Sequence, residues 1–124
     1  DSDYVVLVGY LTNSTIVYGA FHDDKLIGFA SLEGEFFGEM CKYLQLSCLH
    51  VSYEYRGNGI GKRLFKLICE SAKKVGADKL YISAHSSVES QGFYKSLGCV
   101  ETLEYNTKLL ELEPYDCHLE FKLF

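Results

Sequence analysis

Apolar and polar residues alternate through the first half of the chain in the manner of β-strands. Two apolar runs, residues 16–21 and 26–32, flank the turn-forming sequence His22-Asp23-Asp24-Lys25, and this pattern predicts an antiparallel hairpin. The elements expected over this half are, in order, an extended segment (4–11), the hairpin, a loop (34–42) and a long strand (44–53).

The clearest predicted element is an amphipathic helix that begins at residue 60. Its apolar residues recur at intervals of three and four positions and form one continuous stripe, made of Ile60, Leu64, Leu67, Ile68, Ala72 and Val75. Gly76 is expected to end the helix in the left-handed conformation. A strand is expected over 79–84, so that a strand, a helix and a strand predict a parallel pair with a right-handed crossover.

A second, shorter helix is predicted before residue 98. Ser86 and Glu89 are expected to form a capping box at its start, and the helix is expected to run to Leu97 and end at Gly98. Beyond it, strands are expected over 100–103 and 117–123, with a turn or two of helix capped by Asn106 between them.

The last predicted strand has two distinct faces. Cys117, Leu119, Phe121 and Leu123 share the apolar face, and His118, Glu120 and Lys122 share the other. His118, with Asp116 and Glu113, could line a substrate pocket, but solvated positions on the strand surface are the favoured interpretation.

The composition limits the class of protein. A chain of 124 residues, 48% hydrophobic and 15% aromatic, is expected to form one domain over residues 1–124. The net charge of −5 comes without a basic stripe, which argues against a nucleic-acid partner. No apolar run is long enough for a membrane span, and no secretion leader is recognised. Five cysteines, without metal-type spacing to the four histidines, predict reduced thiols, a cytoplasmic location and no metal site.

The sequence Arg56-Gly57-Asn58-Gly59-Ile60-Gly61 lies between the long strand and the amphipathic helix. Its glycines allow a tight turn, and the first amides of the helix have no partner within it, so this turn predicts a phosphate or pyrophosphate site. The Walker loop does not fit, because it needs a glycine at 56 and a hydroxyl at 63, and both positions hold arginine. The dinucleotide fingerprint does not fit either, because its third glycine falls on Lys62.

The remaining pattern, Arg-x-x-Gly-x-Gly after a strand, resembles the acyl-CoA pyrophosphate loop of the GNAT superfamily of N-acetyltransferases. Residues 49–57 look like the central strand of that family, and residues 93–99 resemble its Phe-Tyr-x-x-x-Gly-Phe element, with Cys99 at the usual aromatic position. The resemblance covers roughly residues 14–124 and implies an α/β fold with a mixed α+β sheet, the GNAT-like acyl-CoA N-acyltransferase fold. Only about a dozen residues precede the hairpin, so the fold is expected to lack the family's usual N-terminal strand and helices.

The resemblance also implies acetyl-CoA as co-substrate. The loop amides would hold its pyrophosphate, and its pantetheine arm would run along the edge of the strand. The residues implied for cofactor binding are Leu49, Val51, Arg56, Gly57, Asn58, Gly59, Ile60, Gly61, Lys62 and Ser87. The family often has asparagine at the position of Ser87, so this shorter side chain also fits a role as helix cap. Tyr94 would act as general acid toward the leaving thiolate, the alternative being a packed aromatic ring.

The sequence leaves the general base and the acceptor open. Glu33 and His50 are the candidate bases, with Glu35, His85 or a chain of waters as alternatives. The expected function is acetyl transfer from acetyl-CoA to a primary amine of a small-molecule or peptide acceptor, and the acidic balance mildly favours a cationic one. The rival hypotheses are a non-catalytic acyl-CoA sensor and a homodimer in which a neighbouring chain completes the acceptor site.

Overall fold

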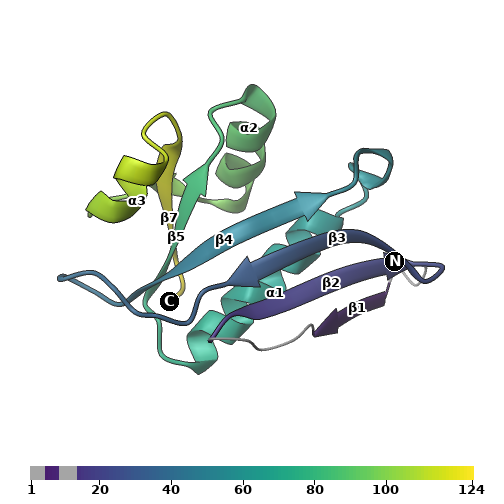
Figure 1. Ribbon diagram of the computed structural model, residues 1–124, viewed down its shortest axis with the longest axis horizontal. Coiled ribbons are helices and arrows are strands. Elements are labelled where there is room, and N and C mark those ends of the chain that lie inside the picture. The colour runs from purple at the N-terminus through teal and green to yellow at the C-terminus, as the bar shows by residue number, and fades with distance from the viewer. Residues whose placement is uncertain (1–4, 9–13) are drawn as a thin grey trace.

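A single mixed sheet organises the part of the chain that the computed structural model describes, residues 5–8 and 14–124 (Figure 1). Its strands are β1 (Val5–Val8), β2 (Ile16–His22), β3 (Lys25–Leu32), β4 (Tyr43–Val51), β5 (Lys79–Ala84), β6 (Val100–Glu101) and β7 (Cys117–Lys122). Their order across the sheet is β1-β2-β3-β4-β5-β7-β6, and β4 with β5 is the parallel pair. The predicted hairpin and the predicted parallel pair are therefore confirmed. Of the extended segment expected over 4–11, residues 5–8 form β1, and the rest lies outside the described residues.

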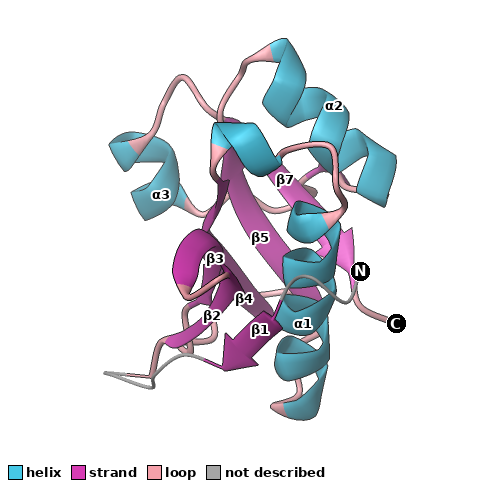
Figure 2. Ribbon diagram, turned by 90° about the vertical axis from the view of Figure 1, so that its right-hand side faces the viewer, coloured by secondary structure: helices cyan, strands magenta, loops and turns pink. Residues whose placement is uncertain are grey.

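Helices pack on both sides of this sheet. They are α1 (Ile60–Lys74), α2 (Val88–Leu97) and α3 (Thr107–Leu112), with a 3-10 turn, η1 (Tyr53–Tyr55), before α1. Figure 2 shows α1 and α2 on one side of the sheet and α3 on the other. As predicted, Gly76 and Gly98 follow α1 and α2 with positive φ angles of 94° and 98°, and Asn106 caps α3.

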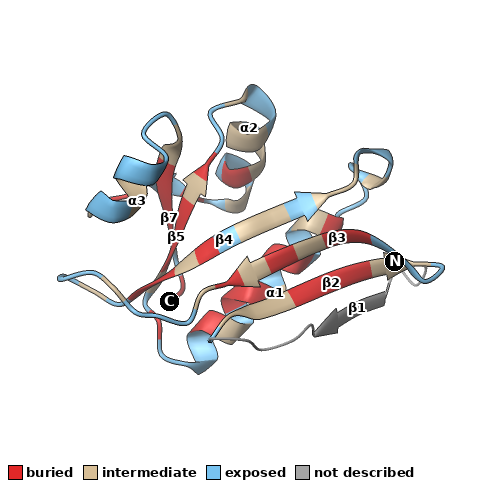
Figure 3. Ribbon diagram, viewed as in Figure 1, coloured by how far each residue is buried: buried red, intermediate tan, exposed pale blue. Residues whose placement is uncertain are grey.

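The core lies between α1 and the strands that it covers (Figure 3). Leu64, Ile68 and Ala72 of the predicted stripe are fully buried, and α1 packs on β2, β3 and β4. The stripe does not extend to Val75 as predicted, because α1 ends at Lys74 and the Val75 residue is 54% exposed. Burial of each large aliphatic side chain contributes about 1.5–3 kcal/mol, so this stripe fixes α1 against the sheet. The glycine turn that precedes α1 is thereby held at one end of the sheet.

Three predicted boundaries are wrong, each because of a hydrogen bond to a distant or neighbouring group. Strand β4 ends at Val51 and not at residue 53, because the chain turns into η1, where the Tyr55 amide donates to the Ser52 carbonyl at 2.9 Å. Strand β6 ends at Glu101, because the Leu103 amide donates to a carboxylate oxygen of Glu120 at 3.0 Å. Helix α2 is capped by Ser87 and not by Ser86.

The outward face predicted for the last strand is also wrong. His118 and Glu120 are buried, with exposed fractions of 3% and 4%. Their side chains lie on the side of the sheet that carries α3, and the segment between β6 and β7 covers them. A strand near the edge of the sheet is thus buried on both faces.

Candidate active site

A cleft opens where the two parallel strands separate. Parallel pairing runs from Tyr43 with Lys79 to Leu46 with Ile82, and β4 then continues to Val51 along β3 alone (Figure 1). The separation coincides with a bulge in β4, because Ser31 pairs with Cys48 whereas Leu32 pairs with Leu46, which leaves Ser47 as the extra residue. A bulge bends its strand and increases its twist, which accounts for the divergence. The β4 edge beyond Leu46 therefore faces a cleft of about 580 Å³.

Most of the residues assigned to the cofactor from the sequence meet in this cleft. Those that line it are Leu49, Val51, Arg56, Gly57, Gly59, Ile60, Gly61 and Lys62. Asn58 and Ser87 do not. The Asn58 side chain instead donates to the Tyr55 carbonyl at 3.1 Å, and the Ser87 hydroxyl accepts from the Ser90 amide at 3.2 Å. Both side chains stabilise their own segments of chain.

The mouth of the cleft is built as an anion site. Gly57 and Gly59 have φ angles of 83° and 78°, a conformation that residues with a Cβ adopt only with strain, and open space surrounds both. The first helical hydrogen bond of α1 runs from the Arg63 amide to the Gly59 carbonyl, so the preceding amides have no partner within the helix. With Lys62 beside them, these amides present positive partial charge to the cleft.

Arg56 braces the loop from the other side. Its Nε donates to the Val51 carbonyl at 2.9 Å, and its Nη1 lies 3.7 Å from the Glu89 carboxylate at the start of α2. The Glu89 side chain is largely exposed, so this ion pair adds little to stability. It places an acidic group at the rim of the anion site.

Helix α2 forms the opposite wall, which the sequence reasoning missed except for Tyr94. Glu89, Ser90 and Phe93 line the cleft with it. A Cβ on Gly61 would lie 3.1 Å from the Phe93 ring, so α2 packs directly on the start of α1. The signal that could have found this wall is the Phe-Tyr pair at 93–94, whose first member touches the glycine loop.

Tyr94 lines the cleft as a largely buried residue. The residue is 9% exposed, and its ring packs against Phe93 with 5.1 Å between centroids. Burial, with smaller contributions from Cys99 and Cys48, raises the pKa of Tyr94 to about 12. Among the described residues no hydrogen-bond partner of this hydroxyl is found, which leaves its proton available to a bound group.

The four candidate bases lie in different places. His50 lines the cleft as an exposed side chain, with its ring 5.7 Å from that of Phe29. His85 accepts a hydrogen bond from the Ser87 amide at 3.1 Å and lies outside the cleft, and Glu35 is exposed on its loop. Glu33 is half-buried and accepts hydrogen bonds from Thr15 and Ser47.

His118 is a structural residue. Its Nδ1 accepts from the Tyr81 hydroxyl at 2.7 Å, and its Nε2 donates to the Glu113 carbonyl at 3.0 Å. The Tyr81 hydroxyl in turn accepts from the Asn106 amide, so this chain of hydrogen bonds fastens α3 to the sheet. The alternative of a substrate pocket lined by His118 therefore finds no support, because its ring nitrogens are taken up by these structural hydrogen bonds.

Other kinds of site find no support within residues 14–124. None of the helices there combines the length and the apolar character of a membrane span. The His, Cys, Asp and Glu side chains of this part of the chain form no group suited to a metal ion. All five cysteines are free thiols.

Comparison with solved structures identifies the fold. The chain resembles the PaiA N-acetyltransferase from Thermoplasma acidophilum in complex with coenzyme A, with 24% identity and a TM-score of 0.69 over 88% of this chain and 61% of that one. It also resembles a GNAT family acetyltransferase from Elizabethkingia anophelis with acetyl-CoA bound, with 17% identity and a TM-score of 0.74 over 98% and 99% of the two chains. It thus spans less than two thirds of the first protein and nearly all of the second.

Sequence comparison assigns the family. No curated protein is significantly similar to the chain in sequence. A profile of the acetyltransferase (GNAT) family, however, matches residues 3–99, which hold the β4 strand, the glycine loop, α1 and α2. The chain belongs to the acetyltransferase (GNAT) family.

Proposed function

We propose that this protein is an acetyl-CoA-dependent N-acetyltransferase that acetylates a primary amine by direct attack on the thioester. The observation that carries the proposal is the cleft between the free edge of β4, the start of α1 and helix α2, with an anion site at its mouth and Tyr94 in its wall. An acyl-CoA has the matching parts, namely a diphosphate, an extended amide-containing arm and a sulfur.

The residues present fit such a cofactor. The left-handed glycines 57 and 59 have open space where a Cβ would stand, so main-chain amides can reach a diphosphate. The open β4 edge at Leu49 and Val51 offers main-chain donors and acceptors to the amides of the pantetheine arm, as a neighbouring strand would. Binding energy from these remote contacts positions the reacting group.

The chain's own groups supply the remaining chemistry. Acetyl-CoA, when bound, supplies an activated acetyl group as a thioester. Tyr94 holds its proton at neutral pH, because burial raises its pKa to about 12, and it can deliver that proton to a departing thiolate. The walls formed by α2 and β4 limit the access of water to this point.

The acceptor is proposed to be a primary amine on a small molecule or a peptide. The net charge of −5 favours a cationic acceptor, since the protein attracts positive charge overall. The solved Arabidopsis thaliana Naa50, which the chain resembles at 24% identity, was crystallised with a bisubstrate analogue that joins coenzyme A to a peptide. That resemblance supports the inclusion of peptides among the acceptors to be tested.

The test is a panel of polyamines, amino sugars, amino acids and peptides incubated with acetyl-CoA. Acetylated products are detected by mass spectrometry, because the five free cysteines would react with a thiol reagent. Acetylation of at least one amine, with a strongly raised KM for acetyl-CoA in the Gly59→Val variant, would support the proposal. Binding of coenzyme A in calorimetry without acetylation of any amine would indicate the sensor instead.

A further inference from the structure

An acidic side chain stands at the mouth of the cleft, where the site is otherwise built for an anion. Glu89 lines the cleft together with Gly57, Gly59 and Lys62. A carboxylate at this place repels the diphosphate that the glycine loop would hold. Glu89 belongs to the first turn of α2, where the helix dipole favours an acidic residue, but the dipole does not require the side chain to reach the glycine loop. Its position therefore points to a role in the site.

The partner of Glu89 is Arg56, at the start of the glycine loop. The Arg56 Nε donates to the Val51 carbonyl at 2.9 Å, and the guanidinium carbon lies 5.6 Å from the centroid of the Tyr53 ring. Its Nη1 lies 3.7 Å from the Glu89 carboxylate. Because Nε is engaged, any binding of a phosphate by Arg56 depends on the Nη groups. Glu89 thus lies against the part of Arg56 that a bound diphosphate would need.

This contact joins two walls of the cleft. Arg56 follows β4 and η1, and Glu89 lies in the first turn of α2, so the pair connects the two sides between which a ligand would enter. Among the ion pairs within residues 14–124, it alone joins two residues that line the cleft. The two side chains are 47% and 85% exposed, so the pair is weak. A diphosphate, with its greater charge, can therefore displace the carboxylate.

We propose that Glu89 competes with the cofactor for Arg56, an inference that rests on the proposed function. While the cleft is empty, the carboxylate holds the guanidinium, and on binding it gives way to a phosphate of acetyl-CoA. The apparent affinity of such a site is its intrinsic affinity multiplied by the fraction of molecules in which the pair is open. The pair therefore lowers the affinity of the cleft for acetyl-CoA and for the product coenzyme A alike.

Calorimetric titration with coenzyme A tests this competition. Glu89→Gln keeps the size of the side chain and removes its charge, so it should bind coenzyme A about threefold more tightly than the wild type, the equivalent of one exposed ion pair. Arg56→Met alone should bind more weakly. In that background Glu89→Gln should bring almost no gain, because the carboxylate has no guanidinium to hold. Urea unfolding checks that Arg56→Met, which loses the bond to the Val51 carbonyl, is folded.

A second variant, Glu89→Asp, tests the competition with Arg56 intact. It keeps the charge but shortens the side chain by one methylene, so it should also bind coenzyme A more tightly than the wild type. The matched control is Glu70→Gln, the same loss of charge as in Glu89→Gln at an exposed position of α1 outside the cleft, which should keep the wild-type affinity.

The outcomes separate this inference from the proposed function. If the wild type binds coenzyme A and Glu89→Gln binds it no more tightly, the competition is excluded and the proposed function stands. An equal gain from Glu89→Gln in the wild-type and Arg56→Met backgrounds, or an unchanged affinity of Glu89→Asp, would also exclude it, since Glu89 would then repel the diphosphate directly. A wild-type protein that binds no coenzyme A would overturn both proposals.

Discussion

The surroundings of Tyr94 make it a proton donor over a wide pH range. Burial is the largest cause of its raised pKa of about 12, so the phenol stays protonated at neutral and mildly alkaline pH. We expect Tyr94→Phe to lower kcat about 100-fold without changing coenzyme A affinity, since the ring packing against Phe93 is kept. Steady-state kinetics between neutral and mildly alkaline pH, with calorimetry, measure both quantities. An unchanged kcat would mean that Tyr94 serves in packing and not as the general acid.

Gly59 tests the anion site, because the two glycines that flank α1, Gly59 and Gly76, share a backbone conformation and only Gly59 borders the cleft. Gly59 and Gly76 have φ angles of 78° and 94°, and open space surrounds both. Valine at either position should cost about 1–2 kcal/mol of unfolding free energy through backbone strain. Only Gly59→Val should also lower the affinity for coenzyme A, by about 30-fold, which is the equivalent of one lost hydrogen bond to a charged group. Equal affinities of the two variants in calorimetry would contradict the loop assignment.

At the scale of elements, a substitution of Ser87 at the start of α2 can distinguish a role in helix capping from a role in cofactor binding. The Ser87 hydroxyl accepts the Ser90 amide, and replacing an N-cap serine by alanine costs about 1 kcal/mol. We therefore expect Ser87→Ala to lower the unfolding free energy by that amount and to leave coenzyme A affinity unchanged. Ser86→Ala, at an exposed position one residue earlier, is the control and should have no effect on stability. Urea unfolding and calorimetry measure the two outcomes.

Elements defined by short-range patterns could be predicted from the sequence. The stripe of α1, the left-handed Gly76 and Gly98, and the hairpin depend on residues that are close in the chain. The end of β6 could not be predicted in the same way, because it is set by the bond from the Leu103 amide to the distant Glu120 carboxylate. The face of β7 that carries His118 and Glu120 is predicted to be solvated, because alternation of apolar and polar residues is typical of a strand with one solvated face. In the structure, the segment that contains α3 covers that face.

The same distinction between local patterns and distant contacts applies to the residues of the site. The glycine loop is contiguous in sequence and was recognisable, and Tyr94 followed from a second short motif. The wall formed by Glu89 and Phe93, and the contact of Glu33 with Ser47, depend on how α2 and the β4 bulge pack in the fold. Apart from the Phe-Tyr pair at 93–94, no local spacing carries that information.

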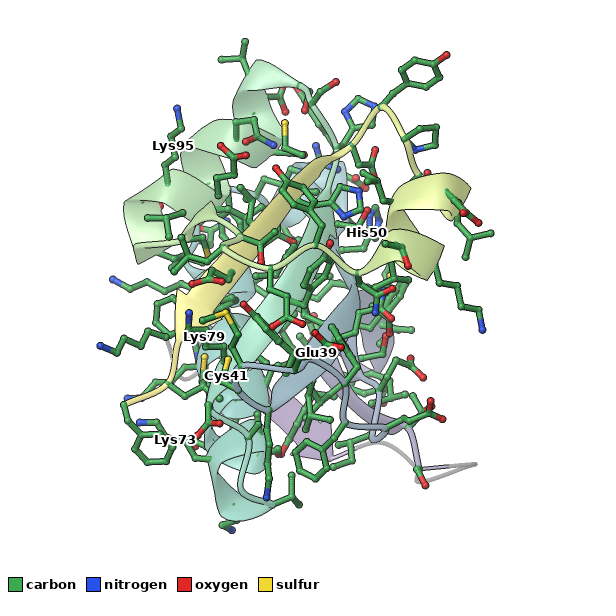
Figure 4. The ribbon with its side chains drawn as sticks, turned by 90° about the vertical axis from the view of Figure 1, so that its left-hand side faces the viewer. Glu39, Cys41, His50, Lys73, Lys79 and Lys95 are labelled. Carbon is green, nitrogen blue, oxygen red and sulfur yellow. The ribbon has the colours of Figure 1, made fainter. Side chains whose placement is uncertain are left out.

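At the scale of the whole molecule, one buried carboxylate joins the two halves of the sheet below the cleft. Glu120 of β7 accepts hydrogen bonds from Tyr43 of β4 at 2.6 Å, Lys79 of β5 at 2.6 Å, and Thr102 and Leu103 after β6. Tyr43 and Lys79 are the first pair of the short parallel ladder. The hydrogen bond to Glu120 is the largest cause of the raised pKa of Lys79, and Cys41, labelled beside Lys79 in Figure 4, makes a smaller contribution. The network therefore holds β4 and β5 together where the cleft needs them fixed.

This network should make the protein sensitive to acid. Burial alone would raise the pKa of Glu120, but hydrogen bonds from Lys79, Tyr43 and the Leu103 amide outweigh it and lower the pKa. A carboxyl whose pKa is lower in the folded state contributes stability that is fully present above its unfolded pKa, about 4.3. That contribution is lost as the pH falls through the lower, folded pKa. Unfolding free energy measured in urea should therefore decrease from pH 6 to pH 3.

Glu120→Gln isolates this contribution, because the amide keeps the size of the side chain and removes its charge. It leaves the Lys79 ammonium, whose side chain is 18% exposed, without its carboxylate partner, so we expect a loss of about 3 kcal/mol at pH 7. Its stability should then fall less steeply than that of the wild type between pH 6 and pH 3, since the group that titrates is gone. Glu70→Gln, at an exposed position, should keep the wild-type slope. Parallel wild-type and Glu120→Gln profiles would mean that other carboxylates cause the acid sensitivity and that Glu120 braces the sheet without titrating.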